Sequence, residues 1–197
     1  LTALRAQMNP HFVFNALNSI QHYILNSKGD EAVRYLSKFA KLIRLILSNS
    51  EKQIVTINED IEALKLYLEL ERMRFENKFD YAIHIDSSID GDYDEIPPML
   101  IQPYLENAIL HGINPKDGNG HIDISMKIVN QFIKISIKDD GIGRHTARLL
   151  QATDSHKHKS LGMKVTSERI GFLNQRHTEH SSIDIMDLTN AEGKASG

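Results

Sequence analysis

LRAQMNPHFVFNALNSI, residues 4–20, is the stretch on which the fold depends. Extended to Leu25, it carries apolar residues at helical spacing and predicts a helix near the start of the chain. At about 100° per residue, one group of polar side chains falls within an arc of roughly 80°. Pro10 stands directly before one of them and tends to bend a helix. The helix is therefore predicted to carry one polar stripe, formed by Gln7, His11, Asn15, Asn18 and His22.

The histidine beside Pro10 is a candidate nucleophile. With an unperturbed pKa of ~6.5, a histidine has an abundant neutral imidazole near neutral pH and needs little activation. Asn15 lies one helical turn after His11 and could orient its ring. A solvated polar face would give the same pattern, so the helix by itself leaves both interpretations open.

The rest of the chain changes in pattern near residue 78. Two further helices are expected before that point, and Thr56 with Glu59 has the spacing of a capping box. After it, apolar residues alternate as in half-buried strands, with helical segments between them. We predict an α+β protein: an N-terminal helical hairpin and connector in residues 1–78, then an α/β sandwich in residues 79–197. The expected helices are 31–47, 61–75, 103–110 and 164–176, and the expected strands are 81–85, 122–128, 132–137 and, less regular, 183–186.

Composition limits the classes of function. The 197 residues are 41% hydrophobic and 25% charged, as in an ordinary globular protein. A formal net charge of -3 offers no basic field for a nucleic-acid backbone, so direct nucleic-acid binding is not expected. The chain has no cysteine, which excludes disulfides and thiolate metal sites. No run reaches the ~20 apolar residues of a membrane span, so the chain as given is expected to be soluble.

Residues 97–112, PPMLIQPYLENAILHG, predict a short helix that carries a polar pair. Asn107 and His111 are four residues apart and share a face. An amide oxygen such as that of Asn107 is a suitable ligand for Mg²⁺, which prefers oxygen. A surface pair on an amphipathic helix is the simpler alternative for these two residues alone.

Two glycine-containing segments follow. Asp139-Asp140-Gly141-Ile142-Gly143 comes directly after a predicted strand, where a carboxylate can accept a hydrogen bond from an exocyclic amine. Residues 160–164, SLGMK, open a predicted helix whose backbone amides would favour a phosphate. Between these segments, residues 144–159 are polar and histidine-rich and are expected to form a mobile lid.

Residues 4–20 closely resemble the phosphoacceptor motif of sensor histidine kinases of the LytS/YehU type. This resemblance implies that His11 is the phosphorylated residue and that the helical hairpin dimerises into a four-helix bundle. Residues 97–112 resemble the N-box of the Bergerat ATP-binding fold, and 139–143 resemble its Asp-x-Gly-x-Gly box. Residues 160–164 look like its second glycine box, although Ser160 stands where a glycine is usual.

The resemblance also implies roles for single residues. Asp139 would recognise adenine, and Asn107 would bind Mg²⁺ with Glu106 as a helper. Phe12 stands where many histidine kinases have an acidic residue that acts as the base, so the identity of the base stays open. The nucleotide pocket would be formed by Asn107, His111, Asp139, Gly141, Gly143, Gly162 and Met163.

The implied protein is a homodimeric two-component kinase core. It would use ATP and Mg²⁺ to phosphorylate His11 and would pass the phosphoryl group to an aspartate of a response regulator, expected to be of the LytTR type. Its parent would be anchored at the cytoplasmic side of the bacterial inner membrane by a sensor region upstream. The resemblance stops short at residues 191–197, so the closing strand usual in the family is expected to be missing from the chain. Two alternatives stay open: a nucleotide-binding scaffold or pseudokinase that signals by conformation, and an ATPase of the gyrase or chaperone type, which would release phosphate.

Overall fold

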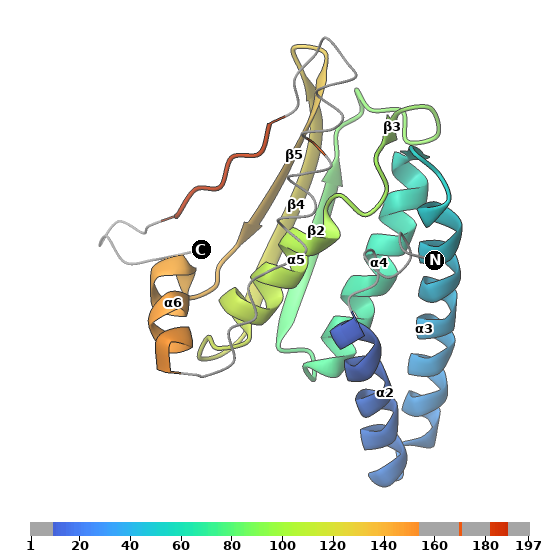
Figure 1. The fold of residues 1–197 in the computed structure, drawn as a ribbon, viewed down its shortest axis with the longest axis vertical. Coiled ribbons are helices and arrows are strands. Elements are labelled where there is room, and N and C mark those ends of the chain that lie inside the picture. The colour runs from blue at the N-terminus through green and yellow to red at the C-terminus, as the bar shows by residue number, and fades with distance from the viewer. Residues whose placement is uncertain (1–9, 154–169, 171–181, 189–197) are drawn as a thin grey trace. The chain divides into compact units, whose positions relative to one another are not determined.

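The computed structural model describes residues 10–153, 170 and 182–188 (Figure 1). The chain forms two compact units. The first comprises Leu1–Lys78, Ile85–Leu100 and Lys127–Phe132, and the second comprises the remaining segments, Phe79–His84, Ile101–Met126 and Ile133–Gly197. In the part of the chain that the structure describes, no helix is long and apolar enough to span a membrane.

Three helices lie in the described part of the first unit: α2 (Pro10–Leu25), α3 (Gly29–Ser50) and α4 (Ile57–Arg74) (Figure 1). A tight turn joins α2 to α3, in which Ser27 has a φ of 58° and the Lys28 N–H donates to the Tyr23 carbonyl over 2.9 Å. The predicted helical hairpin is therefore confirmed. Helix α4 packs against both of its helices, and the shared core contains the buried side chains of Phe12, Ala16, Tyr35, Leu42, Ile46 and Leu68.

The capping box predicted at Thr56 is confirmed. The Thr56 hydroxyl accepts the Glu59 N–H over 3.2 Å, and the Glu59 carboxylate accepts the Thr56 N–H over the same distance. Two donors that would otherwise be unpaired at the helix start are thus satisfied. Just before the helix, β1 (Val55–Thr56) pairs antiparallel with β3 (Glu95–Ile96), a connection that the sequence did not predict.

The second unit is built on a three-stranded sheet in the order β2-β4-β5. Its strands are β2 (Phe79–Ile85), β4 (Gly120–Val129) and β5 (Phe132–Asp139). Ile122, Ile124 and Met126 of β4 are buried at every second position, the alternation that predicted this strand. Asn130 and Gln131 have φ values of 51° and 70°, which form the two-residue turn between β4 and β5.

The helices of this unit differ from the prediction in two ways. The expected helix 103–110 begins as α5 (Gln102–Asn107) and continues as a π-helix, η1 (Ala108–Ile113). Residues 144–153 of the expected lid belong to a regular helix, α6 (Gly143–Thr153), and not to a loop, so their role as a lid stays a prediction. The remainder of that segment lies outside the described residues.

Two predictions near the C-terminus have different outcomes. The strand predicted at residues 183–186 is wrong, since the described residues 182–188 contain neither helix nor strand. The helix predicted at 164–176 lies outside the described residues apart from Ile170. The α+β class is confirmed, because the described helices and sheet combine as predicted.

Candidate functional site

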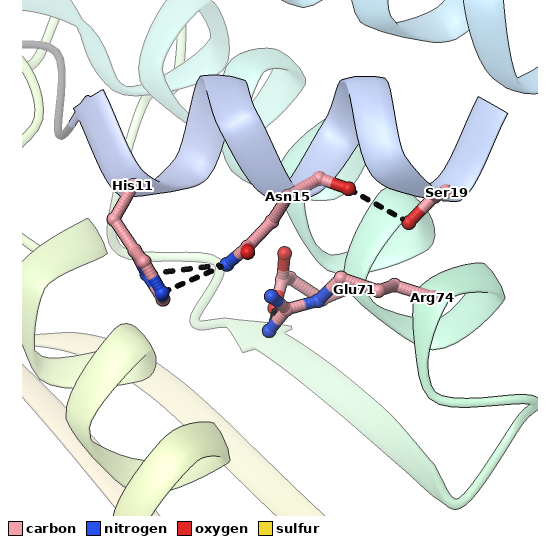
Figure 2. Close-up of polar contacts among 5 residues, drawn as sticks. All are labelled: His11, Asn15, Ser19, Glu71 and Arg74. Atoms are coloured by element: carbon pink, nitrogen blue, oxygen red, sulfur yellow. Dashed lines mark hydrogen bonds and ion pairs between the residues drawn. The ribbon is translucent and has the colours of Figure 1, made fainter. Parts of the chain in front are cut away.

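His11 and Asn15 form a side-chain pair on α2 (Figure 2). The Asn15 Nδ2 atom lies 3.1 Å from Nδ1 and 3.5 Å from Nε2 of the His11 ring. Residues four apart on a helix are neighbours, so the backbone itself brings the two side chains together. His11 is exposed and Asn15 is half-buried, which leaves the imidazole open to a reagent that approaches from solvent.

The residues next to this pair hold the helix in place. Phe12 is 7% exposed and its ring lies 6.1 Å from that of Phe39 and 5.4 Å from that of Tyr67. Because Phe12 points into the core, the preceding residue, His11, is turned about 100° away from it. The Ser19 hydroxyl donates to the Asn15 carbonyl over 2.9 Å, as Figure 2 shows.

The Asn15 amide can select the tautomer of the His11 ring. A neutral imidazole has one N–H donor and one acceptor, whereas an amide carries both an oxygen and an NH₂ group on one carbon. In the structure the Nδ2 group faces Nδ1 and can donate to it. With the amide turned by 180° about its Cβ–Cγ bond, its oxygen would accept the proton from Nδ1, and the lone pair of Nε2 would be available as a nucleophile. The predicted orienting role of Asn15 is thus chemically reasonable for this geometry.

A second histidine–asparagine pair lies at the end of α2. The Asn26 Nδ2 atom is 3.3 Å from both ring nitrogens of His22 and also donates to the His22 carbonyl over 2.8 Å. Eleven residues separate His22 from His11, close to three full turns, so both histidines lie on one side of the helix. The local spacing therefore does not distinguish the two histidines, and only their surroundings do.

In the second unit, the segment of Gly112 and the loop of Gly141 are in direct contact. The Ile142 N–H donates to the Gly112 carbonyl over 3.0 Å. A Cβ atom added to Gly141 would lie 2.5 Å from the backbone of Gly112 and 2.7 Å from Oδ1 of Asp139. Both glycines are therefore required by the close approach of the two segments.

Asp139 ends β5 beside this contact. Its Oδ1 atom accepts the Gly141 N–H over 3.0 Å. Burial raises the pKa of Asp139 above its ordinary value; the Gly141 hydrogen bond opposes this effect, and the neighbouring Asp140 adds to it. The side chain is thus a half-buried carboxylate at the end of a strand, the setting expected for a group that accepts a hydrogen bond from a ligand.

Asp140 behaves differently from its neighbour. Burial would raise its pKa, but the Lys116 ammonium group at 2.8 Å and the His121 backbone N–H at 2.7 Å hold the pKa of Asp140 below its usual range. These contacts tie the loop after β5 to the segments around it. Neither Lys116 nor this tethering role was predicted, since two adjacent aspartates carry no signal of which one is paired.

The predicted metal and nucleotide residues lie on α5 and η1. Glu106 and Asn107 are half-buried at the end of α5, and His111 is half-buried within the π-helix, an irregularity often found at functional sites. Burial lowers the pKa of His111, so its ring is neutral at pH 7. No group of three or more histidine or acidic side chains is arranged for a metal among the described residues.

The structure brings some of the predicted nucleotide-site residues together, whereas others lie outside the described residues. The helix that carries Asn107 and His111 meets, through Gly112, the loop of Asp139 and Gly141. Gly143 starts α6 with a φ of 74°. Gly162 and Met163 lie outside the described residues.

Comparisons with known proteins converge on one group. Residues 1–79 match the family model described as "Histidine kinase". The sensor protein LytS of Staphylococcus epidermidis is 32% identical over 143 residues, which are 73% of this chain and 24% of that protein. The sensor histidine kinase YpdA of Escherichia coli is 31% identical over 177 residues, 90% of this chain and 29% of that protein.

Two further matches have the same character. The sensor histidine kinase YesM of Bacillus subtilis is 32% identical over 173 residues, 86% of this chain and 28% of that protein. Among solved structures, the histidine kinase domain of a blue-light activated histidine kinase from Erythrobacter litoralis has a TM-score of 0.47 and 12% identity, covering 88% of this chain and 82% of that one. The chain thus spans about a quarter of the length of these curated relatives.

Proposed function

The chain belongs to the histidine kinase family, and from that membership we propose that it is the core of a two-component sensor kinase that transfers the γ-phosphoryl group of ATP to His11. Residues 1–78 would provide dimerisation and the acceptor, and residues 79–197 would bind the nucleotide in a Bergerat-type sandwich. The phosphoryl group would then pass to an aspartate of a response regulator, of the LytTR type by resemblance. The parent protein would be held at the bacterial inner membrane by its sensor region.

The His11–Asn15 pair is the observation that carries this proposal. The acceptor must be exposed, neutral and held in one tautomer if its lone pair is to reach phosphorus in line. His11 is exposed on α2, and the Asn15 amide lies 3.1 Å from its Nδ1 atom. The exposure of the acceptor and a partner beside its ring are thus provided by two side chains of a single helix.

Phosphoryl transfer to His11 forms one bond and breaks another. The lone pair of Nε2 forms the new P–N bond while the bond from the γ-phosphorus to the bridging oxygen breaks, and its electron pair leaves with ADP. The imidazole is then positively charged until it loses the proton from Nδ1. The amide of Asn15 is no base, so the proton is taken up by water.

Residues of the second unit are chemically suited to bind ATP. Asp139 offers a half-buried carboxylate to the exocyclic amine of adenine, and Gly141 leaves room for backbone to approach. Mg²⁺ usually takes one or two protein oxygens together with substrate phosphates, so the Asn107 amide would suffice, with Glu106 beside it. Bound there, the ion would neutralise charge on the phosphates. His111, Gly143, Gly162 and Met163 complete the proposed pocket.

Labelled phosphate tests this function directly. The purified chain is incubated with Mg²⁺ and ATP labelled in the γ position, and the protein is assayed for acid-labile, base-stable phosphate. A labelled protein is expected. Nucleotide binding without label would favour a scaffold that signals by conformation, and released inorganic phosphate without label would favour an ATPase.

Asp139→Asn is expected to weaken ATP binding by about ten- to hundredfold, the effect of a buried polar contact that is lost. The asparagine oxygen can still accept the Gly141 N–H, so the local turn is kept. Because the pKa of Asp139 is raised in the fold, its ionised form lowers stability above that pKa, and the substitution should leave stability at pH 7 unchanged or higher. Calorimetry for binding and urea unfolding for stability separate the two effects.

The same pKa shift predicts how ATP affinity depends on pH. Only the ionised carboxylate accepts a hydrogen bond with both oxygens, so affinity should fall as the pH falls through the raised pKa of Asp139. The decrease should begin at a higher pH than for an exposed aspartate and should be absent in Asp139→Asn. An identical pH profile for both proteins would remove Asp139 from the adenine site.

The hairpin also supports the proposed homodimer. Large apolar side chains are exposed on both of its helices, namely Phe14, Leu17 and Ile24 of α2 and Val33 and Leu36 of α3. Leu36 is 50% exposed in the single chain, and such a concentration of apolar surface is typical of a protein interface.

Leu36→Glu is therefore expected to shift the chain from dimer to monomer, because a charge would be buried against apolar surface. Sedimentation velocity at several concentrations gives the association state. Ser48→Glu, at an exposed polar position of the same helix, is the matched control and should leave the dimer intact. A Leu36→Glu protein that remains dimeric would place the interface elsewhere.

A further inference from the structure

We propose that the guanidinium group of Arg74, held in place by Glu71 on α4, binds the oxygens of the phosphoryl group while it is transferred to His11. This inference rests on the proposed function, and it assigns a residue that lies 63 positions from His11, outside every motif that the sequence indicated. The observation behind it is an ion pair on the face of α4 that packs against α2, in which the Glu71 side chain is 2% exposed and the Arg74 side chain 14% exposed.

Contacts between α2 and α4 place the pair. At one point the Phe12 ring lies 5.4 Å from the Tyr67 ring, and at another the Tyr23 hydroxyl donates to the Met73 carbonyl over 2.8 Å. Positions four and seven residues after Tyr67 lie on the same face of a helix, and these positions are Glu71 and Arg74.

Asn15 stands on the facing side of α2. It is three residues after Phe12, which places it on the side of α2 that faces α4. Figure 2 shows the Arg74 side chain running beneath α2 with its guanidinium end directed toward Asn15 and His11. The acceptor pair and the ion pair therefore lie on sides of α2 and α4 that face each other within the first unit.

Tyr35 of α3 gives independent support for this arrangement. Burial raises the pKa of Tyr35 to about 12, and the Ser19 hydroxyl, Glu71, Arg74 and Tyr23 all act on it as well. Its hydroxyl makes no hydrogen bond of good geometry within the described residues, but it is near enough to Ser19 for that hydroxyl to affect its pKa. Ser19, which bonds to Asn15, and the Glu71–Arg74 pair thus act on one buried group.

The charges of the pair suit an anion. Glu71 is 2% exposed, and Nη2 of Arg74 lies 2.6 Å from its Oε2 atom. The Arg74 Nε atom is buried without a hydrogen-bond partner in the described part of the chain, and the guanidinium centre lies 4.2 Å from the Phe75 ring centroid. A guanidinium carries five N–H donors in a planar fork that matches phosphate oxygens. Glu71 fixes one end of that fork, which leaves donors for a phosphoryl group.

No sequence pattern indicates this pair. Glu71 and Arg74 stand in the charged run of α4, where most such residues form solvated i,i+3 or i,i+4 pairs. The distinguishing property is their burial, which depends on α2 packing over them and has no local signature in the sequence.

The first experiment measures the autophosphorylation rate against ATP concentration for wild type and Arg74→Gln. The maximal rate of the variant should fall at least about tenfold, as expected when a charge-assisted hydrogen bond to the transferred group is lost, while the KM for ATP stays unchanged. Arg74→Lys keeps the charge without the fork and should recover part of the rate. Arg72→Gln, two residues away and on another face of α4, is the matched control and should react like wild type.

Loss of Arg74 also removes an ion-pair partner from the buried Glu71 carboxylate, which can destabilise the fold. The double variant Glu71→Gln/Arg74→Gln removes both charges and should restore thermal stability without restoring the rate. A full recovery of the rate in the double variant would overturn the proposal, because the pair would then be only structural. Equal maximal rates in wild type and Arg74→Gln would overturn it as well.

A second experiment is independent of the nucleotide site. Phosphoramidate phosphorylates histidine directly: the imidazole lone pair forms a P–N bond to its phosphorus while ammonia leaves. His22, whose Asn26 pair lies on the same helix, serves as an internal reference in the same molecule. Arg74→Gln should lower phosphate at His11 relative to His22, as followed by phosphorus NMR with His11→Gln and His22→Gln for assignment. An unchanged ratio would overturn the role of Arg74, whereas a wild type that reacts with phosphoramidate but never with ATP would overturn the proposed kinase function alone.

Discussion

His11→Gln is expected to reduce ATP-dependent labelling of the chain to background. The substitution removes the only nucleophilic lone pair that the Asn15 amide holds in position, and glutamine offers no comparable nitrogen. Nucleotide affinity should be unchanged, because the proposed ATP site consists of residues of the second unit. Acid-labile label on the protein and calorimetric ATP binding are the two measurements.

His22→Gln is the matched control for this experiment. His22 belongs to the same helix, lies on the same side and pairs with an asparagine four residues later, as His11 does. Its variant should keep full labelling if the surroundings of the histidine, and not the local pair, determine the acceptor. Label that persists in His11→Gln and disappears in His22→Gln would identify His22 as the acceptor.

Local sequence predicted the parts of the fold that depend on local physics. The apolar spacing of α2 and α3 and the short polar break between them indicated the hairpin, and Thr56 with Glu59 indicated where α4 begins. Alternation in β4 was equally clear, since Ile122, Ile124 and Met126 point to one buried face. In each case the signal is a periodicity or a cap within about ten residues.

Features that depend on distant contacts were missed. Strand β1 is two residues long and exists because Val55 pairs with Ile96, some forty positions away. Helix α6 was expected to form a lid because the segment is polar and histidine-rich, and its packing against η1 had no signal in the sequence. The burial of Glu71 and Arg74 likewise depends on another helix. Candidate residues in motifs could therefore be named from the sequence, whereas the residues that surround them could not.

Gly141→Ala should have the largest effect on the second unit. Its new Cβ would stand 2.5 Å from the backbone carbons of Gly112 and 2.7 Å from Oδ1 of Asp139, closer than real Cβ atoms approach. Backbone cannot rotate away as a flexible side chain can, so the two segments must separate, at a cost of about 1–3 kcal/mol by comparison with other overpacked sites. Because Asp139 moves with them, ATP binding should be lost together with stability. Urea unfolding followed by circular dichroism and calorimetric binding measure the two effects.

Two alanine controls separate the collision from other effects of the added methyl group. Gly29, at the start of α3, has nothing within 4 Å of the added Cβ, so Gly29→Ala should be neutral or slightly stabilising. Gly118 also has open space but a φ of 79°, so Gly118→Ala should cost about 1–2 kcal/mol through backbone strain and leave ATP affinity unchanged. If Gly141→Ala binds ATP as tightly as Gly118→Ala, the contact between the two glycine segments cannot be what shapes the nucleotide site, and Asp139 must be positioned by β5 alone.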